Sequence, residues 1–183
     1  MSRLKAWWAR RVNRADDPSW RLYRAVAAPA TTPARLRAFG LEDTPETRFE
    51  LLAVHLAAAW ARLQAGAPAV RALKQGVSEA FVADMDASLR DMGAGDLGVG
   101  KRVKTLMQRL YGRFQAYAPA FAEDGGADTA DIDAALARNL YKDMDEQDPR
   151  TLAQARASVA DLWAAWRALS DDEILAGAAP RLQ

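Results

Sequence analysis

The sequence predicts an all-α protein: a single compact multi-helix domain with a central helical hairpin that turns at glycines. Apolar residues recur at steps of three and four along most of the chain, which is the period of a helix that buries one face. No segment alternates apolar and polar residues as a half-buried strand does, and alanine is abundant while β-branched residues are scarce. With 183 residues, of which 50% are hydrophobic, the chain is long enough to bury the core of one domain.

Residues 1–43 are predicted to form a basic N-terminal helical extension. Its first part, residues 1–15, has the pattern of a basic helix with Trp7 and Trp8 on the apolar side. Basic helices with tryptophan often lie at a membrane surface. One interpretation is therefore peripheral membrane contact through these two side chains; the alternative is a terminal helix that docks on the rest of the protein.

Two more helices of this extension are predicted from cap-and-proline pairs. The pair at 17–18 opens a helix by the rule that proline suits the first helical position, and we expect Pro29 to end it. The pair at 32–33 opens a short helix that closes at Gly40.

The main domain is predicted over residues 44–176, and it begins with the most apolar helix of the chain. This helix starts at Thr44 and ends at Gly66, and residues 51–61 carry no charge. The uncharged run is shorter than the roughly 20 residues that cross a bilayer, so we expect a helix buried in the centre of a bundle. His55 is then a core histidine that hydrogen-bonds a neighbour, with a role in partner contact as the alternative.

The next predicted helix starts at Pro68 and forms the first half of the hairpin. Gly76 lies in its middle, where glycine costs about 1 kcal/mol relative to alanine, and either close packing or chance would explain it. Asp84 falls beside the apolar stripe, where a carboxylate needs a partner. We expect Arg102 or Lys101, brought back by the hairpin, to supply that partner.

The hairpin itself spans residues 84–117. Gly93 should end the first helix, because the residue after a helix often needs a left-handed conformation that glycine adopts cheaply. Asp96 is the expected N-cap of the second helix. Further glycines keep the connection tight: Gly95, Gly98 and Gly100. The second helix carries one apolar stripe: Val99, Val103, Leu106, Leu110, Phe114, Tyr117 and Phe121.

The C-terminal third predicts two longer helices and a short one. Apolar residues at steps of four predict a helix over 129–144, and the Asp–Pro pair at 148–149 opens a last long helix. Residues 171–176 add a short helical turn, and 177–183 are predicted to be a loose tail. The buried face of the last long helix is Leu152, Val159, Leu162, Trp163 and Trp166.

Two nucleotide-binding patterns occur in the hairpin, and neither has the required context. Residues 93–98 fit G-x-G-x-x-G, and residues 95–101 fit the start of a P-loop. Both motifs need a preceding strand, which here is a predicted helix, and Arg102 stands where the P-loop needs Ser or Thr. The chain also has no cysteine and a single histidine. We therefore predict no cofactor, no metal site and no catalytic residues.

Charge is unevenly distributed although the net charge is only +1. The C-terminal third is acidic, whereas the second hairpin helix is basic. Such asymmetry indicates either a charged partner or internal pairing of the two regions, and the sequence favours neither. Together with aromatic residues of the same helix, the basic residues are the candidate contacts for a partner polypeptide: Lys101, Arg102, Lys104, Arg109, Tyr111, Arg113 and Tyr117.

The hairpin also resembles the signature of the ubiquinol–cytochrome c chaperone family. The resemblance extends over about residues 44–169 and has many positions at fixed spacing. It rests on Phe49-Glu50-Leu51-Leu52, His55-Leu56, Asp84-Met85-Asp86, Leu89-Arg90, the run from Gly93 to Leu97, the run from Val99 to Lys104, and Tyr111-Gly112-Arg113.

This resemblance implies a non-enzymatic assembly chaperone that binds newly made cytochrome b, or another subunit, for the cytochrome bc1 complex. Mitochondrial relatives are similar in working with a small partner protein near the ribosome. It further implies a bacterial cytoplasmic protein, in peripheral contact with the inner face of the membrane in one interpretation. The alternative function is a helical adaptor that docks through its basic face on anionic membrane or ribosomal RNA, and DNA is not an expected partner.

Overall fold

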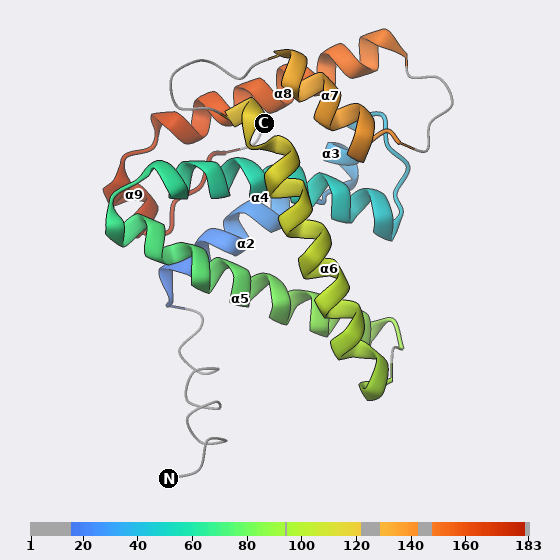
Figure 1. Cartoon of the computed structure of the whole chain (residues 1–183), viewed down its shortest axis with the longest axis vertical. Coiled ribbons are helices and arrows are strands. Elements are labelled where there is room, and N and C mark those ends of the chain that lie inside the picture. Colours follow the sequence, from blue (N-terminus) through green and yellow to red (C-terminus); the bar gives the residue numbers. More distant parts are fainter. Residues whose placement is uncertain (1–15, 94, 122–128, 143–147, 182–183) are drawn as a thin grey trace.

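The central element of the structure, a computed structural model, is the apolar helix α4, Pro45–Ala65, with other helices packed around it (Figure 1). The structure describes residues 16–93, 95–121, 129–142 and 148–181, and every regular element within them is helical. Helix α4 begins with the predicted Thr44 cap, which forms a capping box with Thr47. It contacts α2, α5, α6 and α8, and its middle is buried on all sides, as the uncharged run predicts.

Helices α2, Pro18–Ala30, and α3, Pro33–Ala38, cover one side of this centre. Leu22 and Tyr23 of α2 are buried against α4 and α5, so this part of the predicted extension shares the core of the main domain. Helix α2 does not end at Pro29 as predicted but continues to Ala30. Pro29 has no amide hydrogen to donate to the carbonyl four residues back, and the helix ends one residue after it. Residues 1–15, including Trp7 and Trp8, lie outside the described residues.

Helix α5, Pro68–Asp91, packs closely against α2 at Gly76. A Cβ atom at Gly76 would lie 2.5 Å from Ser19 Cβ, which is closer than real side chains approach. Of the two explanations that the sequence left open for this glycine, close packing is therefore the one that the structure supports. Helix α2 crosses α5 at a position where the Ser19 side chain lies directly against the Gly76 backbone and leaves no room for a side chain at residue 76.

Helix α6, Asp96–Tyr117, completes the predicted hairpin. Gly93 has φ of +83°, so it ends α5 in the left-handed conformation as predicted. The N-cap of α6 is Gly95, however, and Asp96 is its first helical residue. The backbone explains this shift: Gly95 is extended and its carbonyl accepts a hydrogen bond from the Gly98 amide at 2.9 Å, so the first turn closes one residue early.

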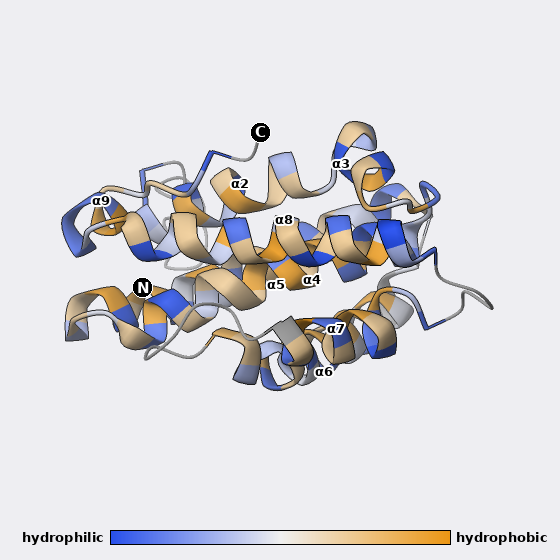
Figure 2. Cartoon of the chain, turned by 90° about the horizontal axis from the view of Figure 1, so that it is seen from above, coloured by the Kyte–Doolittle hydropathy of each residue, from blue (hydrophilic) through white to orange (hydrophobic). Residues whose placement is uncertain are grey.

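The turn of the hairpin lies at the end of the molecule opposite α7 and α8 (Figure 1). A small cluster of Leu89, Val99 and Val103 is buried there, separate from the main core. Figure 2 shows α2 and α6 on opposite sides of α4 and α5, with hydrophobic residues facing inward. The arrangement leaves the outer face of α6 uncovered along most of its length.

The C-terminal elements close the other side of the core. They are η1 (Pro119–Phe121), α7 (Thr129–Asn139), α8 (Pro149–Ala168) and α9 (Asp171–Leu175). Helix α8 has the predicted Asp148 cap and buries Trp163 and Trp166. Helix α7 ends at Asn139, earlier than the predicted 144, where Tyr141 turns inward to donate a hydrogen bond to the Phe39 carbonyl at 2.8 Å.

The last described residues are also held against the body of the protein. Asp171 of α9 pairs with Arg62 of α4 at 2.7 Å and accepts a hydrogen bond from the Ala67 amide at 2.7 Å. Ala179, in the predicted loose tail, packs against the core. Among the helices of the described ranges, none combines the length and the apolar character that crossing a membrane requires.

Candidate functional site

The predicted contact residues all lie on α6, but the structure places them in three different environments. Arg109 and Arg113 face α4, where Glu50 is 3% exposed. Arg113 donates two hydrogen bonds to the Glu50 carboxylate, at 2.6 and 2.7 Å, and Arg109 donates one at 2.7 Å. Arg109 also pairs with Glu46 at the surface. The hydrogen bonds to Glu50 hold the pKa of Arg113 above its ordinary value.

These ion pairs change the interpretation of Arg109 and Arg113, which the sequence suggested as contacts for a partner polypeptide. Arg109 and Arg113 form internal ion pairs, and their partners come from α4, not from the acidic C-terminal helices. The physical reason is that α6 crosses α4 directly, so that the buried Glu50 needs both guanidinium groups to compensate its loss of water. The two arginines fix α6 on α4 and contribute little free charge to a partner.

Tyr117, a predicted contact residue, is fully buried, with 0% of its surface exposed. Its hydroxyl lies 3.5 Å from the Ala135 carbonyl, and burial raises its pKa. Tyr117 belongs to the apolar stripe that faces the core, so it does not lie on any surface that a partner could contact.

Asp84 also has a partner other than the predicted one. The Tyr23 hydroxyl donates a hydrogen bond of 2.6 Å to the Asp84 carboxylate, and neither Arg102 nor Lys101 reaches it. Burial, with the nearby carboxylate, raises the pKa of Tyr23. Asp84 therefore connects α5 to α2, because it lies on the side of α5 that α2 covers.

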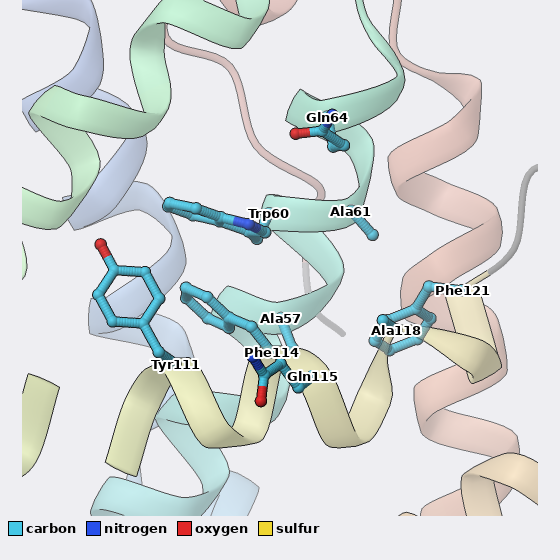
Figure 3. A pocket seen from close by; sticks show the side chains of 9 residues that line it. All are labelled: Ala57, Trp60, Ala61, Gln64, Tyr111, Phe114, Gln115, Ala118 and Phe121. Atoms are coloured by element: carbon cyan, nitrogen blue, oxygen red, sulfur yellow. The ribbon is translucent and has the colours of Figure 1, made fainter. Parts of the chain in front are cut away.

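Tyr111 borders a groove between α4 and α6 that is lined mainly by aromatic residues and alanines, and we call it the aromatic groove (Figure 3). The Trp60 and Phe114 rings are stacked with centroids 4.6 Å apart, and Tyr111 packs edge-on against both, at 5.8 and 5.7 Å. Tyr111 is 42% exposed, which is unusual for a large side chain in this protein. The groove has a volume of about 580 Å³, and it is lined by Ala57, Trp60, Ala61, Gln64, Tyr111, Phe114, Gln115, Ala118 and Phe121.

No charged side chain lines the aromatic groove, although one stands at its edge. Lys74 of α5 places its ammonium 5.1 Å from the Trp60 ring, and Ser78 lies 3.4 Å from the Tyr111 hydroxyl. The sequence interpretation missed Trp60 as a surface residue. Its signal was present, because Trp60 lies on the strongest apolar face of α4, within the uncharged run 51–61. Such a pattern does not distinguish a ring in the core from a ring in a groove.

A second groove of about 400 Å³ lies between α2, α4, α5 and α6. Methionines line it, and Met92 at its end is 63% exposed. The charged residues at its rim are engaged within the protein: Arg48 pairs with Asp43, and Arg109 with Glu46. This groove is therefore less available to a charged partner than its composition suggests.

The remaining predicted contacts lie near the hairpin turn. Lys101, Arg102 and Lys104 are all exposed, and their side chains form no ion pair with the residues that the structure describes. They differ from Arg109 and Arg113 because α4 does not extend under this part of α6. In the same described ranges, no three metal-ligating side chains come together.

Comparison with known proteins gives three findings. The family model described as "Ubiquinol-cytochrome C chaperone" matches residues 37–181. A solved structure, the crystal structure of the Cbp3 homolog from Brucella abortus, is similar with a TM-score of 0.75 and 32% sequence identity, over 98% of this chain and 97% of that chain. A search of curated proteins finds no match.

Proposed function

Because the chain belongs to the ubiquinol–cytochrome c chaperone family, we propose that it is a non-enzymatic assembly chaperone of the bc1 complex. Its proposed client is newly made cytochrome b, or another subunit of that complex. The family match over residues 37–181 carries this proposal, and the similarity to the Cbp3 homolog over nearly the whole chain supports it.

We propose further that the aromatic groove binds an apolar segment of the client. An unassembled membrane protein exposes helices with few charges, and a groove binds such a helix by burying apolar area. The side chains that line the aromatic groove include four large aromatic residues and no charge, so an uncharged helix would bury no unpaired charge there. Tyr111, at 42% exposure, is the most exposed aromatic side chain of the groove, and a bound helix would cover it.

The cellular setting follows from the proposed client. We place the protein in the cytoplasm, next to the inner face of the membrane into which cytochrome b is inserted. Ribosomes and a small partner protein are further proposed contacts, by analogy with the family's mitochondrial members. The alternative of an adaptor that binds RNA through the whole basic face is weakened, because Arg109 and Arg113 are held by glutamates of α4.

The first experiment is deletion of the gene, followed by haem b spectra of the membranes. We expect loss of the bc1 complex, because the client is no longer protected before assembly. Normal bc1 content in the deletion strain would exclude the proposed function.

The second experiment restores the deletion strain with variants of α6. Tyr111→Glu places a charge in the aromatic groove and should lower cytochrome b recovery by about tenfold, since a buried carboxylate without a partner is costly. Gln108→Glu makes the same change in charge at an exposed position of the same helix outside the groove and should have no effect. Wild-type recovery with both variants, while the deletion still loses bc1, would reject the groove but keep the chaperone function.

A further inference from the structure

The charges of α6 are divided into two groups along the helix. Toward its C-terminal end, Arg109 and Arg113 are neutralised by Glu50 and Glu46. Toward its N-terminal end, three cations within four residues are exposed and form no ion pair with the described residues: Lys101, Arg102 and Lys104. We call this second group the cationic tip, and it is the part of the basic helix whose charge is available to another molecule.

The cationic tip lies at one end of the molecule, above a small cluster of buried apolar residues. Leu89, Val99 and Val103 are buried under it and pack α5 against α6 there, and Met85 and Leu106 connect this small cluster to the main core. Met92, at the end of α5, is 63% exposed beside the hairpin turn. Figure 1 places this turn away from α7 and α8, where a flat surface could approach it. Three exposed cations without an ion-pair partner among the described residues, and one exposed apolar side chain, therefore occur together at one end.

We propose that the cationic tip docks the protein on an anionic lipid surface. Phosphate headgroups would meet the three cations, and Met92 would enter the boundary between headgroups and acyl chains. Each lysine or arginine near an anionic surface strengthens binding about fivefold, so the three together give on the order of 100-fold at low salt. Asp91 is an exposed acid at the same end, and it reduces this gain without cancelling it.

The observations favour lipid over RNA as the partner. Three cations are few for binding by phosphate contacts alone, and an exposed methionine gains nothing from RNA. Lys104 and Tyr111 are seven residues apart, two helical turns, so they share one face of α6. The cationic tip and the aromatic groove would then face the same lipid bilayer, which offers anionic headgroups to the tip and apolar chains to the groove.

The test measures binding of the full chain to vesicles of phosphatidylcholine, with and without phosphatidylglycerol, by flotation. The triple variant Lys101→Gln, Arg102→Gln and Lys104→Gln should lose at least tenfold in affinity for the anionic vesicles. The control variant neutralises three exposed arginines elsewhere and changes the net charge equally: Arg37→Gln, Arg150→Gln and Arg181→Gln. It should bind as the wild type does, and circular dichroism checks that both variants fold.

Each other outcome overturns the proposal. Equal binding to neutral and anionic vesicles would exclude charge recognition, and equal loss in the two triple variants would show an effect of net charge alone. Loss on Trp7→Ser with Trp8→Ser, with the tip variant unaffected, would assign membrane binding to the N-terminal segment. A larger loss of affinity for single-stranded RNA than for vesicles would make RNA the partner. If the triple variant does not fold, the single variant Lys101→Gln is tested in its place. Its affinity for anionic vesicles should fall about fivefold, and an unchanged affinity would overturn the proposal.

Discussion

The single histidine of the chain provides a clean test of the core around α4. His55 is 1% exposed, and its Nδ1 lies 2.7 Å from the Leu51 carbonyl, so we assign the ring proton to Nδ1. Its Nε2 is buried and has no hydrogen-bond partner among the described residues. Burial in apolar surroundings disfavours the imidazolium and lowers the pKa of His55 from 6.5 to about 4.

This lowered pKa makes the free energy of unfolding depend on pH. Between pH 6.5 and about 4, the unfolded chain binds a proton that the folded chain does not. Acidification through this window therefore destabilises the fold, and stability rises with pH until the ring is neutral in both states. For a shift of this size, the loss from neutral pH to about pH 5 is roughly 2 kcal/mol.

The assay is urea unfolding followed by circular dichroism across this pH range, for the wild type and for His55→Leu. The leucine variant keeps an apolar side chain of similar size and cannot take up the proton, so its stability should change less with pH. Carboxylates affect both proteins alike, and the difference between them isolates His55. An identical pH dependence in the two proteins, or a histidine NMR resonance that titrates near pH 6.5, would refute the reasoning.

Three further substitutions test the helix contacts by the same unfolding assay. Gly76→Ala should lower the free energy of unfolding by about 1–3 kcal/mol, because its Cβ would overlap Ser19, and an unchanged value would contradict the close approach. Gly98→Ala should raise stability by up to about 1 kcal/mol, because a Cβ there meets nothing within 4 Å; a marked loss would be inconsistent with its open surroundings. Glu50→Gln should cost about 3 kcal/mol, because it leaves Arg113 partly buried without a counter-charge, and a stable variant would show that the pair is dispensable.

The helices were predictable because their signals are local. Proline and cap residues such as Thr44 and Asp148 mark the starts, and Gly93 marks an end, since each acts on backbone groups a few residues away. The buried character of α4 was predictable for a similar reason: a helix that is apolar on all sides must be surrounded by others. Helix ends that depend on tertiary contacts were less accurate, as at Pro29 and Asn139.

The site was less predictable because it depends on which helices cross. The basic residues of α6 have one pattern in the sequence, yet Arg113 is bound by a buried glutamate, whereas Lys104 is exposed and pairs with no acid of the described part of the chain. Tyr111 and Tyr117 lie only six residues apart, yet one borders the aromatic groove and the other is in the core. Periodicity places each of these residues on a side of its helix, but it does not say what covers that side.

The sequence by itself determined the all-α class, the glycine-ended hairpin and the family, because caps, helical period and a spaced signature are all properties of neighbouring residues. Only the tertiary structure decided that Tyr23 is the partner of Asp84, that Glu50 pairs with Arg109 and Arg113, and that Trp60 and Tyr111 form one groove. Those contacts join residues about 50 or more positions apart. Their energies come from burial and charge pairing between elements, which no local pattern encodes.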